Sequence, residues 1–199
     1  MISENGHRTH GFSSASFLDS NEILDELKLT GSETFMDAGC GDGHIAMKVL
    51  NEYITEGMVY AVDIYNDSIE DMETYKKKNN IENLININSD ITEGIDGVGD
   101  ESIDVVLMVN VFHGFKASRR IDEAISELSR IIKQDGKIAI MDYKAWDVPN
   151  GPPTQVRSSP EDIEGFFNNH GLKKCYLNED IGESIPEGKS HFLIMFQKE

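Results

Sequence analysis

Short apolar runs alternate along the chain with segments in which apolar residues recur at helical spacing. Runs typical of buried parallel strands occupy residues 34–38, 58–62 and 103–109, and the last is the most apolar run of the chain. A segment with a helical period follows the first run over residues 44–53. This alternation predicts an α/β fold built around a mostly parallel sheet.

The remaining periodic segments complete seven strands and the helices between them. Further strands are predicted over residues 84–88, 137–142, 172–177 and 191–197. Further helices are predicted over residues 20–29, 68–78, 118–133 and 160–170. Ser118 is the expected N-cap of its helix, and Asp135–Gly136 the turn into the next strand. After five strand–helix units, a closing antiparallel hairpin is expected, with helices on both faces of the sheet.

A turn with three glycines at alternate positions, Gly39, Gly41 and Gly43, follows the first strand directly. A strand, a glycine turn and a helix are typical of a nucleotide-binding crossover, where the backbone turns sharply against the ligand. The dinucleotide fingerprint G-x-G-x-x-G places its third glycine one position later, where this chain has His44. Asp37, two residues before the first glycine, would repel a pyrophosphate but suits a cationic ligand.

The pattern D-x-G-x-G-x-G after a strand resembles motif I of the class I S-adenosylmethionine (AdoMet)-dependent methyltransferases, of the type 11/25-like, small-molecule kind. The resemblance covers the chain from about residue 29 to its end. It implies a Rossmann-like α/β fold with a seven-stranded, mostly parallel sheet and a C-terminal antiparallel hairpin. It also implies AdoMet as methyl donor and S-adenosylhomocysteine (AdoHcy) as product.

Asp63 follows the second strand about 20 residues beyond the glycine turn, where nucleotide-binding α/β units place a carboxylate on the ribose hydroxyls. A helix cap for the next segment is the alternative role. The resemblance implies that Asp90 holds the adenine amino group and that Ile91 packs on the ring, although Asp before a loop is also an ordinary turn residue. The expected cofactor-binding residues are Asp37, Ala38, Gly39, Cys40, Gly41, Gly43, Asp63, Ile64, Asp90, Ile91 and Asn110.

Residues 110–115, N-V-F-H-G-F, follow the central strand and face the same crevice as the glycine turn. They are similar to the Asn/Asp-x-x-His stretch of many small-molecule methyltransferases and differ from the N/D-P-P-Y/F of enzymes that methylate amino groups of nucleic acids. His113 is the only histidine expected in the crevice, so it is the candidate catalytic base, and a role in shaping the pocket is the alternative. The loop over residues 143–158 supplies Tyr143, Trp146 and Arg157 as candidate substrate contacts.

The N-terminal segment is expected to form an arm and lid helix over residues 1–30, ahead of a methyltransferase domain over residues 31–199. Phe12 and Phe17 are the apolar residues expected to reach the substrate pocket from this lid. In the alternative, Phe17 and Leu18 only fasten the first helix to the domain. His7 and His10 lie three apart but have no third ligand nearby, so a solvated arm is expected there.

Composition limits the partners. The 199 residues are 39% hydrophobic and carry a formal charge of −18 from 36 acidic and 18 basic residues, which argues against a nucleic-acid substrate. Two cysteines give neither a disulfide framework nor a metal-binding spacing, and no run reaches the ~18 apolar residues of a membrane span. A cytoplasmic protein with a small-molecule substrate and no membrane or metal partner is expected, and assembly into a homo-oligomer is left open.

Two other kinds of function stay open beside a small-molecule methyltransferase. One is a methyltransferase that acts on a protein or RNA. The other is a nicotinamide-dependent oxidoreductase or a non-catalytic AdoMet-binding module. Within the methyltransferases, Cys40 and Cys175 cannot supply the cysteine set that arsenite enzymes need, and the acidic magnesium cluster of catechol-type enzymes is missing at matching places.

Overall fold

The computed structural model describes residues 13–146 and 151–199. Seven strands form one sheet in the order β3-β2-β1-β4-β5-β7-β6. The strands are β1 (Thr34–Ala38), β2 (Met58–Asp63), β3 (Leu84–Asn88), β4 (Ile103–Val109), β5 (Ile132–Tyr143), β6 (Leu172–Ile185) and β7 (Gly188–Lys198). Neighbours among β1 to β5 pair in parallel, whereas β7 pairs antiparallel with both β5 and β6. The predicted mostly parallel sheet with a closing hairpin is confirmed.

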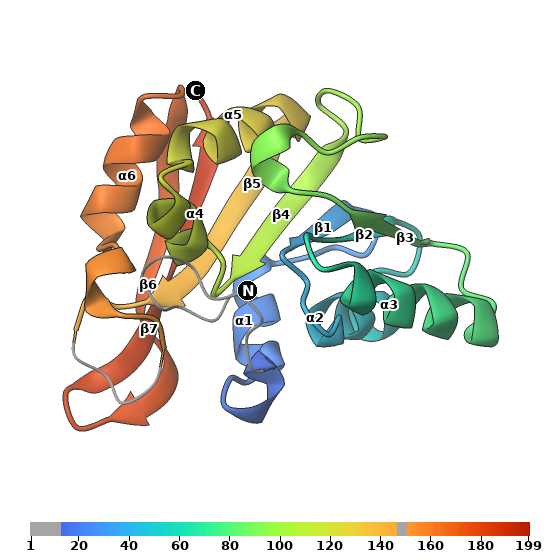
Figure 1. Ribbon diagram of the computed structural model, residues 1–199, viewed down its shortest axis with the longest axis horizontal. Helices are drawn as coiled ribbons and strands as arrows, with labels where there is room; N and C mark the ends of the chain where they lie inside the picture. The colour runs from blue at the N-terminus through green and yellow to red at the C-terminus, as the bar shows by residue number, and fades with distance from the viewer. Residues whose placement is uncertain (1–12, 147–150) are drawn as a thin grey trace.

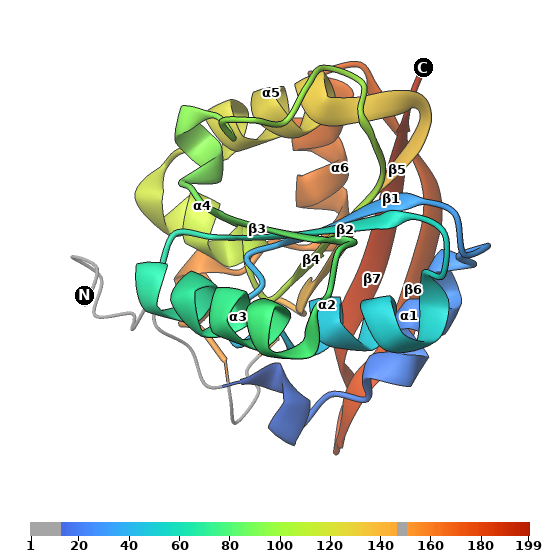
Figure 2. The same cartoon turned by 90° about the vertical axis from the view of Figure 1, so that its right-hand side faces the viewer.

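Helices cover both faces of this sheet (Figures 1 and 2). The α-helices are α1 (Ser20–Leu27), α2 (His44–Lys48), α3 (Asn66–Asn79), α4 (Phe112–Ser118), α5 (Ile121–Ile131) and α6 (Pro160–Asn168). A π-helix, η2 (Val49–Tyr53), continues α2, and the short 3₁₀ helices are η1 (Ser14–Ser16), η3 (Ile91–Glu93) and η4 (Thr154–Val156). The helices α1, α2 and α3 lie on one face and α4, α5 and α6 on the other. Across the part of the chain that the structure describes, no helix is long and apolar enough to cross a membrane.

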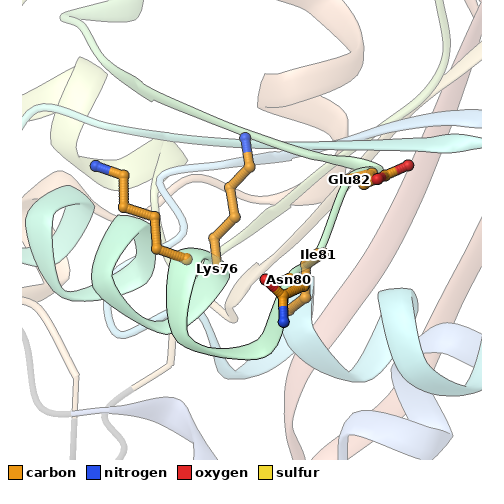
Figure 3. A pocket seen from close by; sticks show the side chains of 5 residues that line it. Lys76, Asn80, Ile81 and Glu82 are labelled. Atoms are coloured by element: carbon orange, nitrogen blue, oxygen red, sulfur yellow. The ribbon is translucent and has the colours of Figure 1, made fainter.

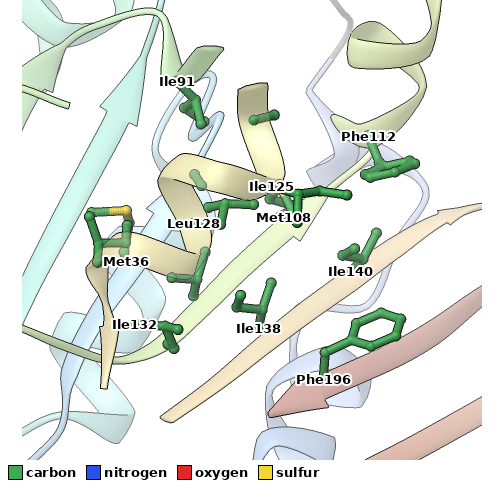
Figure 4. Close-up of a cluster of buried hydrophobic side chains, with 14 of the residues drawn as sticks. Met36, Ile91, Met108, Phe112, Ile125, Leu128, Ile132, Ile138, Ile140 and Phe196 are labelled. Carbon is green, nitrogen blue, oxygen red and sulfur yellow. The ribbon is translucent and has the colours of Figure 1, made fainter. Parts of the chain in front are cut away.

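Two apolar clusters hold these layers together, and the alternation along β5 shows how the sheet serves both. Ile138 and Ile140 point into the cluster under α4, α5 and α6, where Figure 4 shows them beside Phe196. Ala139 and Met141 point into the cluster that packs against α1, α2 and α3. Successive side chains of a strand point to opposite faces, so the apolar stretch over residues 138–141 is buried on both sides of the sheet.

The predicted helix over residues 118–133 is wrong at its start. The structure has two helices here, and Ser118 ends the first instead of capping the second. The Ser118 hydroxyl donates to the carbonyl of Gly114 at 3.0 Å, one turn back, and Arg119 then turns left-handed with φ +60°. A serine that bonds back to its own helix cannot serve as the N-cap of the next one.

Three other predicted boundaries also shift. The expected turn at Asp135–Gly136 lies within β5, which already begins at Ile132, and the pairing of β5 with β4 has an irregularity near its start. The closing hairpin is longer than predicted, because β6 runs to Ile185 and β7 begins at Gly188. Helix α1 ends at Leu27, short of the predicted residue 29, because Lys28 adopts a left-handed conformation. The long hairpin matters for function, since its turn stands at the carboxyl edge of the sheet.

Candidate active site

The glycine turn between β1 and α2 leaves only one of its three glycines open to a ligand. A Cβ on Gly39 (φ +83°) would stand 2.4 Å from Val111, and one on Gly43 (φ +76°) would stand 2.5 Å from the sulfur of Met72. Gly39 therefore needs glycine for packing as well as for the backbone angle, whereas at Gly43, where the flexible end of Met72 can shift, the backbone angle is the main requirement. Gly41 (φ +54°) has no atom within 4 Å of where its Cβ would lie. This open face leaves room for a ligand against the backbone, and cofactor contact there stays a prediction.

Asp63 at the end of β2 reaches the glycine turn, as the sequence spacing predicts. One carboxylate oxygen accepts from the backbone N–H of Gly41 at 2.8 Å and the other from that of Tyr65 at 2.9 Å. The second bond lies at the start of α3, so the carboxylate also organises that helix. A carboxylate offers about four lone-pair directions, which leaves two for the hydroxyls of a ribose. The ribose role fits this geometry and stays a prediction.

Asp37 is 2% exposed and lies beneath the same turn. Its carboxylate accepts from the backbone N–H of Ala46 at 3.0 Å, at the beginning of α2. Burial raises the pKa of Asp37 to about 7, against the effect of the Ala46 hydrogen bond, and the negative charges of Asp63 and Asp42 add to the rise. A cationic ligand beside this carboxylate would favour its ionised form, so the predicted contact of Asp37 with the cofactor fits this burial and stays a prediction.

The two predicted adenine contacts, Asp90 and Ile91, make contacts within the protein. Asp90 accepts from the backbone and hydroxyl of Thr92 at 2.9 and 2.7 Å, so it caps η3. Ile91 is buried in the cluster under α5. Ile64, in contrast, is 56% exposed directly after Asp63, which leaves an apolar surface for a ring to cover. Adenine binding by Asp90 and Ile91 stays a prediction.

Two further predicted cofactor contacts, Ala38 and Cys40, can offer a ligand only their backbone. Ala38 is fully buried, and the sulfur of Cys40 points inward to within 3.8 Å of the sulfur of Met72. The backbone N–H groups of Gly39 and Cys40 both donate to the carbonyl of Val62, at 2.8 and 3.0 Å. These bonds tie the turn to β2 and fix its distance from Asp63.

His113 of α4 and Asp142, near the end of β5, form a buried pair at the carboxyl edge of the sheet. The Nδ1 atom of His113 lies 2.9 Å from Oδ1 of Asp142, whose Oδ2 accepts from the His113 backbone N–H at 3.0 Å. Burial alone would raise the pKa of Asp142, but His113 and the N–H of Tyr143 lower it below its usual value. An ionised carboxylate that fixes one imidazole nitrogen is the usual means of orienting a histidine for proton transfer.

The sequence placed only one histidine in the crevice, but the structure brings a second, His191, to the same edge. His191 is fully buried on β7, opposite Tyr143 of β5, with the two rings 4.1 Å apart. Its Nε2 lies 3.1 Å from Oδ1 of Asn110, at the tip of β4. Because the last strand of an antiparallel hairpin starts at the carboxyl edge, the predicted hairpin could have indicated that residues near its start lie at the site. Which of them faces the site depends on the register, which the sequence does not show.

The predicted substrate contacts of the loop after β5 differ in exposure. Tyr143 is buried under His191 and Gly151. Arg157 is 5% exposed and donates to the carbonyls of Pro152 at 2.8 Å and Trp146 at 2.5 Å, so it holds the loop backbone. Trp146 is 40% exposed, with Nζ of Lys144 4.1 Å from its ring centroid. Substrate contact by Tyr143, Trp146 and Arg157 stays a prediction.

The N-terminal residues meet the site through a polar contact. The Ser14 hydroxyl of η1 lies 3.1 Å from Nε2 of His44, whose Nδ1 lies 2.7 Å from Asp42. Phe17 is half-buried against the cluster under α1, and Leu18 lies inside it. Phe12, predicted at the pocket, and His7 and His10 lie outside the described residues. Within residues 13–146 and 151–199, no group of three or more His, Cys, Asp or Glu could hold a metal ion.

Residues 29–189 match the protein family described as a methyltransferase domain. The chain is 27% identical to the tRNA(Thr) (cytosine(32)-N(3))-methyltransferase of Saccharomyces cerevisiae, over 74% of this chain and 24% of that protein. It is 28% identical to an uncharacterized methyltransferase of Schizosaccharomyces pombe, over 71% of this chain and 50% of that protein. A crystal structure of a SAM-dependent methyltransferase from Aquifex aeolicus superposes with a TM-score of 0.77 at 22% identity, covering 94% and 93% of the two chains.

The fold and the site define a class of protein, the class I enzymes that use AdoMet as their cofactor. The chain belongs to the AdoMet-dependent methyltransferase family. It spans half or less of the length of the two curated relatives, so what those whole proteins do does not pass to it directly.

The charge state of Asp37 makes cofactor affinity depend on pH. Because a bound cation favours the ionised form, binding of AdoMet releases a proton while the free carboxyl is still protonated. We expect AdoMet affinity to rise roughly tenfold from about pH 6 to about pH 8 if binding lowers the pKa of Asp37 by about two units. Asp37→Asn can keep the bond from Ala46 but cannot ionise, so its affinity should stay flat. Equal pH dependence in both proteins, measured by calorimetry, would contradict this role.

Removal of the Asp63 carboxylate tests the ribose contact. Asp63→Ala is expected to weaken AdoMet binding by about tenfold or more, the scale of a lost charge-assisted hydrogen bond. Asp67→Ala, which removes an acid from the first turn of α3, is the matched control and should leave the affinity unchanged. Unaltered affinity in a folded Asp63→Ala protein refutes the ribose role.

Proposed function

We propose that this enzyme transfers the methyl group of AdoMet to a small molecule whose accepting atom loses a proton during the reaction. The observation that carries the proposal is the buried His113–Asp142 pair, at the same edge of the sheet as the open face of Gly41. A base contributes only where the acceptor must be deprotonated, so hydroxyl, amine and acidic carbon acceptors fit this pair.

AdoMet, when bound, supplies a methyl carbon that its sulfonium already activates. The protein's part is chiefly to align the acceptor, and such alignment contributes on the order of 7–11 kcal/mol. In the proposed mechanism Asp142 holds Nδ1 of His113, which directs the opposite nitrogen, Nε2, to the acceptor. His113 takes the acceptor proton, and the neighbouring negative charge of Asp142 stabilises the imidazolium that forms.

The main run of cations lies away from the site, so it cannot bind the phosphates of an RNA acceptor there, and this supports a small acceptor. Lys76, Lys77 and Lys78 are the only run of three cations in the sequence, and they lie in the last turn of α3. Since α3 runs back from the carboxyl end of β2 to the start of β3, this turn lies at the edge of the sheet opposite the site. The surface hollow that Figure 3 shows is there too, lined by Lys76, Lys77, Asn80, Ile81 and Glu82.

An RNA acceptor is the second candidate, because one curated relative is named as a tRNA methyltransferase. The cations near the site argue against it. Lys116 donates to the carbonyl of Arg157, Arg157 binds carbonyls of its own loop, and Lys144 sits over the ring of Trp146. These side chains interact within the protein, whereas binding of a nucleic acid would require them to contact its phosphates.

Incubation of cell extract with methyl-labelled AdoMet and the pure enzyme separates the two candidates. Label in the small-molecule fraction, and none in RNA or protein, is the expected result. Label that appears only in RNA, and disappears after ribonuclease treatment, would reject the small-molecule acceptor. Heat-inactivated enzyme serves as the control for methyltransferases already present in the extract.

The proposed base can be tested on the labelled small-molecule fraction. His113→Ala should slow methyl transfer by roughly 10²–10⁴-fold, the usual contribution of a general base. His170→Ala is a matched control, because His170 also pairs with an aspartate, Asp122 at 3.1 Å, but at the end of α6 away from the site. A His113→Ala enzyme that binds AdoHcy normally and keeps the wild-type rate would overturn the role of the base.

The arm over residues 1–30 is proposed to cover the cofactor, supported by the contact of Ser14 with His44 beside the glycine turn. The cytoplasmic location expected from the sequence stays a prediction.

A further inference from the structure

We propose that His191 is a positioning residue for the cofactor site. It acts through Asn110, which it holds so that the tip of β4 packs against the glycine turn. This inference rests on the proposed role of the turn and of Asn110 in AdoMet binding. It assigns to β7 a part in cofactor affinity, although no residue of that strand is among the expected contacts.

His191 stands in a continuous chain of hydrogen bonds that runs from the hairpin to β4. The backbone N–H of Glu183 in β6 donates to the Ser190 hydroxyl at 3.0 Å, and that oxygen lies 2.6 Å from Nδ1 of His191. On its other side, Nε2 of His191 lies 3.1 Å from Oδ1 of Asn110. Both ring nitrogens are therefore engaged, as a fully buried imidazole requires.

The ring is also confined by packing. The ring of Tyr143 lies against it, tilted by 40°, with the two centroids 4.1 Å apart. Gly182, in a left-handed conformation at φ +91°, leaves room for the ring, since a Cβ there would lie 2.6 Å from Nδ1. A side chain so confined has one orientation, so it can impose an orientation on its partner.

The backbone of Asn110 is left-handed, with φ +59°, and its side chain is the one that His191 contacts. This conformation is uncommon for a residue with a Cβ, and it turns the chain sharply at the end of β4. The turn sends Val111 onto Gly39, with the valine methyl 2.4 Å from the position of a glycine Cβ. His191 thus reaches the first glycine of the cofactor turn through two intervening residues.

The protonation state of His191 suits this role. The pKa of His191 is lowered to about 4, mainly by burial; Arg157 and His113 contribute, while Asp142 acts in the opposite direction. The ring is therefore neutral at physiological pH and carries one proton. Because the carboxamide oxygen of Asn110 can only accept, that proton belongs on Nε2, and Nδ1 accepts from the Ser190 hydroxyl.

A double-mutant cycle with AdoHcy as the probe tests the proposal. His191→Leu removes the donor, and we expect AdoHcy affinity to fall about tenfold, the scale of one lost hydrogen bond and the turn it holds. His191→Gln keeps an N–H donor and should recover most of the affinity. Asn110→Gly adopts the same backbone angle without a side chain, so His191→Leu added to it should cost less than twofold.

Phe192→Leu is the control for a general loss of stability, because Phe192 is equally buried but points into the cluster under α4, α5 and α6. It should lower the unfolding temperature without changing AdoHcy affinity. A long-range ¹H–¹⁵N spectrum adds a reading on the wild-type protein that does not depend on any variant. It should show His191 protonated on Nε2 at neutral pH.

Three results would overturn the proposal. The first is wild-type AdoHcy affinity in a folded His191→Leu protein, and the second is an equal loss of affinity when His191→Leu is added to the wild-type protein and to Asn110→Gly. The third is a proton on Nδ1 of His191. Failure of the proposed function looks different. Wild-type protein that binds no AdoHcy removes the cofactor assignment itself. Wild-type protein that binds AdoHcy but labels no small molecule removes only the proposed acceptor.

Discussion

The structure depends on the contact between the Asp63 carboxylate and the backbone of the glycine turn. One oxygen fixes Gly41 and the other fixes the start of α3, so a single side chain joins two neighbouring crossovers. Asp37 below it is buried, and burial together with the negative charges of Asp63 and Asp42 raises its pKa. The turn therefore offers a ligand open backbone and negative charge, a combination that suits a sulfonium and an ammonium and disfavours a diphosphate.

The other side of the site holds two buried histidines with different hydrogen-bond partners. His113 is tied to an ionised carboxylate, which prepares it to accept a proton. His191 is tied to a hydroxyl and an amide, and burial keeps it neutral. Under the two proposals, the same residue type serves proton transfer in one place and positioning in the other, according to its hydrogen-bond partners.

The sequence predicted most accurately those features that depend on residues close together in the chain. The strands β1, β3 and β4 have the predicted bounds, because each is a short periodic run closed by a turn or polar residue. Asp63 meets the glycine turn because both follow adjacent parallel strands. The sequence could not show that Ser118 bonds back to Gly114, since a serine before a helical stretch equally fits an N-cap.

What the sequence missed depends on pairing between distant segments. His191 enters the site only because β7 pairs with β5 in one particular register, and a slip of one residue would turn its side chain to the other face. The loop roles of Arg157 likewise arise from backbone carbonyls brought together by folding, and a lone arginine in a Pro-rich stretch does not reveal them.

The most direct test of the account compares binding of AdoMet, AdoHcy and NADH to the same protein sample by calorimetry. If the carboxylates at the glycine turn select a positively charged sulfur cofactor, AdoMet and AdoHcy bind and NADH gives no heat of binding. Binding of NADH with no response to AdoMet would contradict the account, because it would show that the turn accepts the diphosphate it is built to exclude.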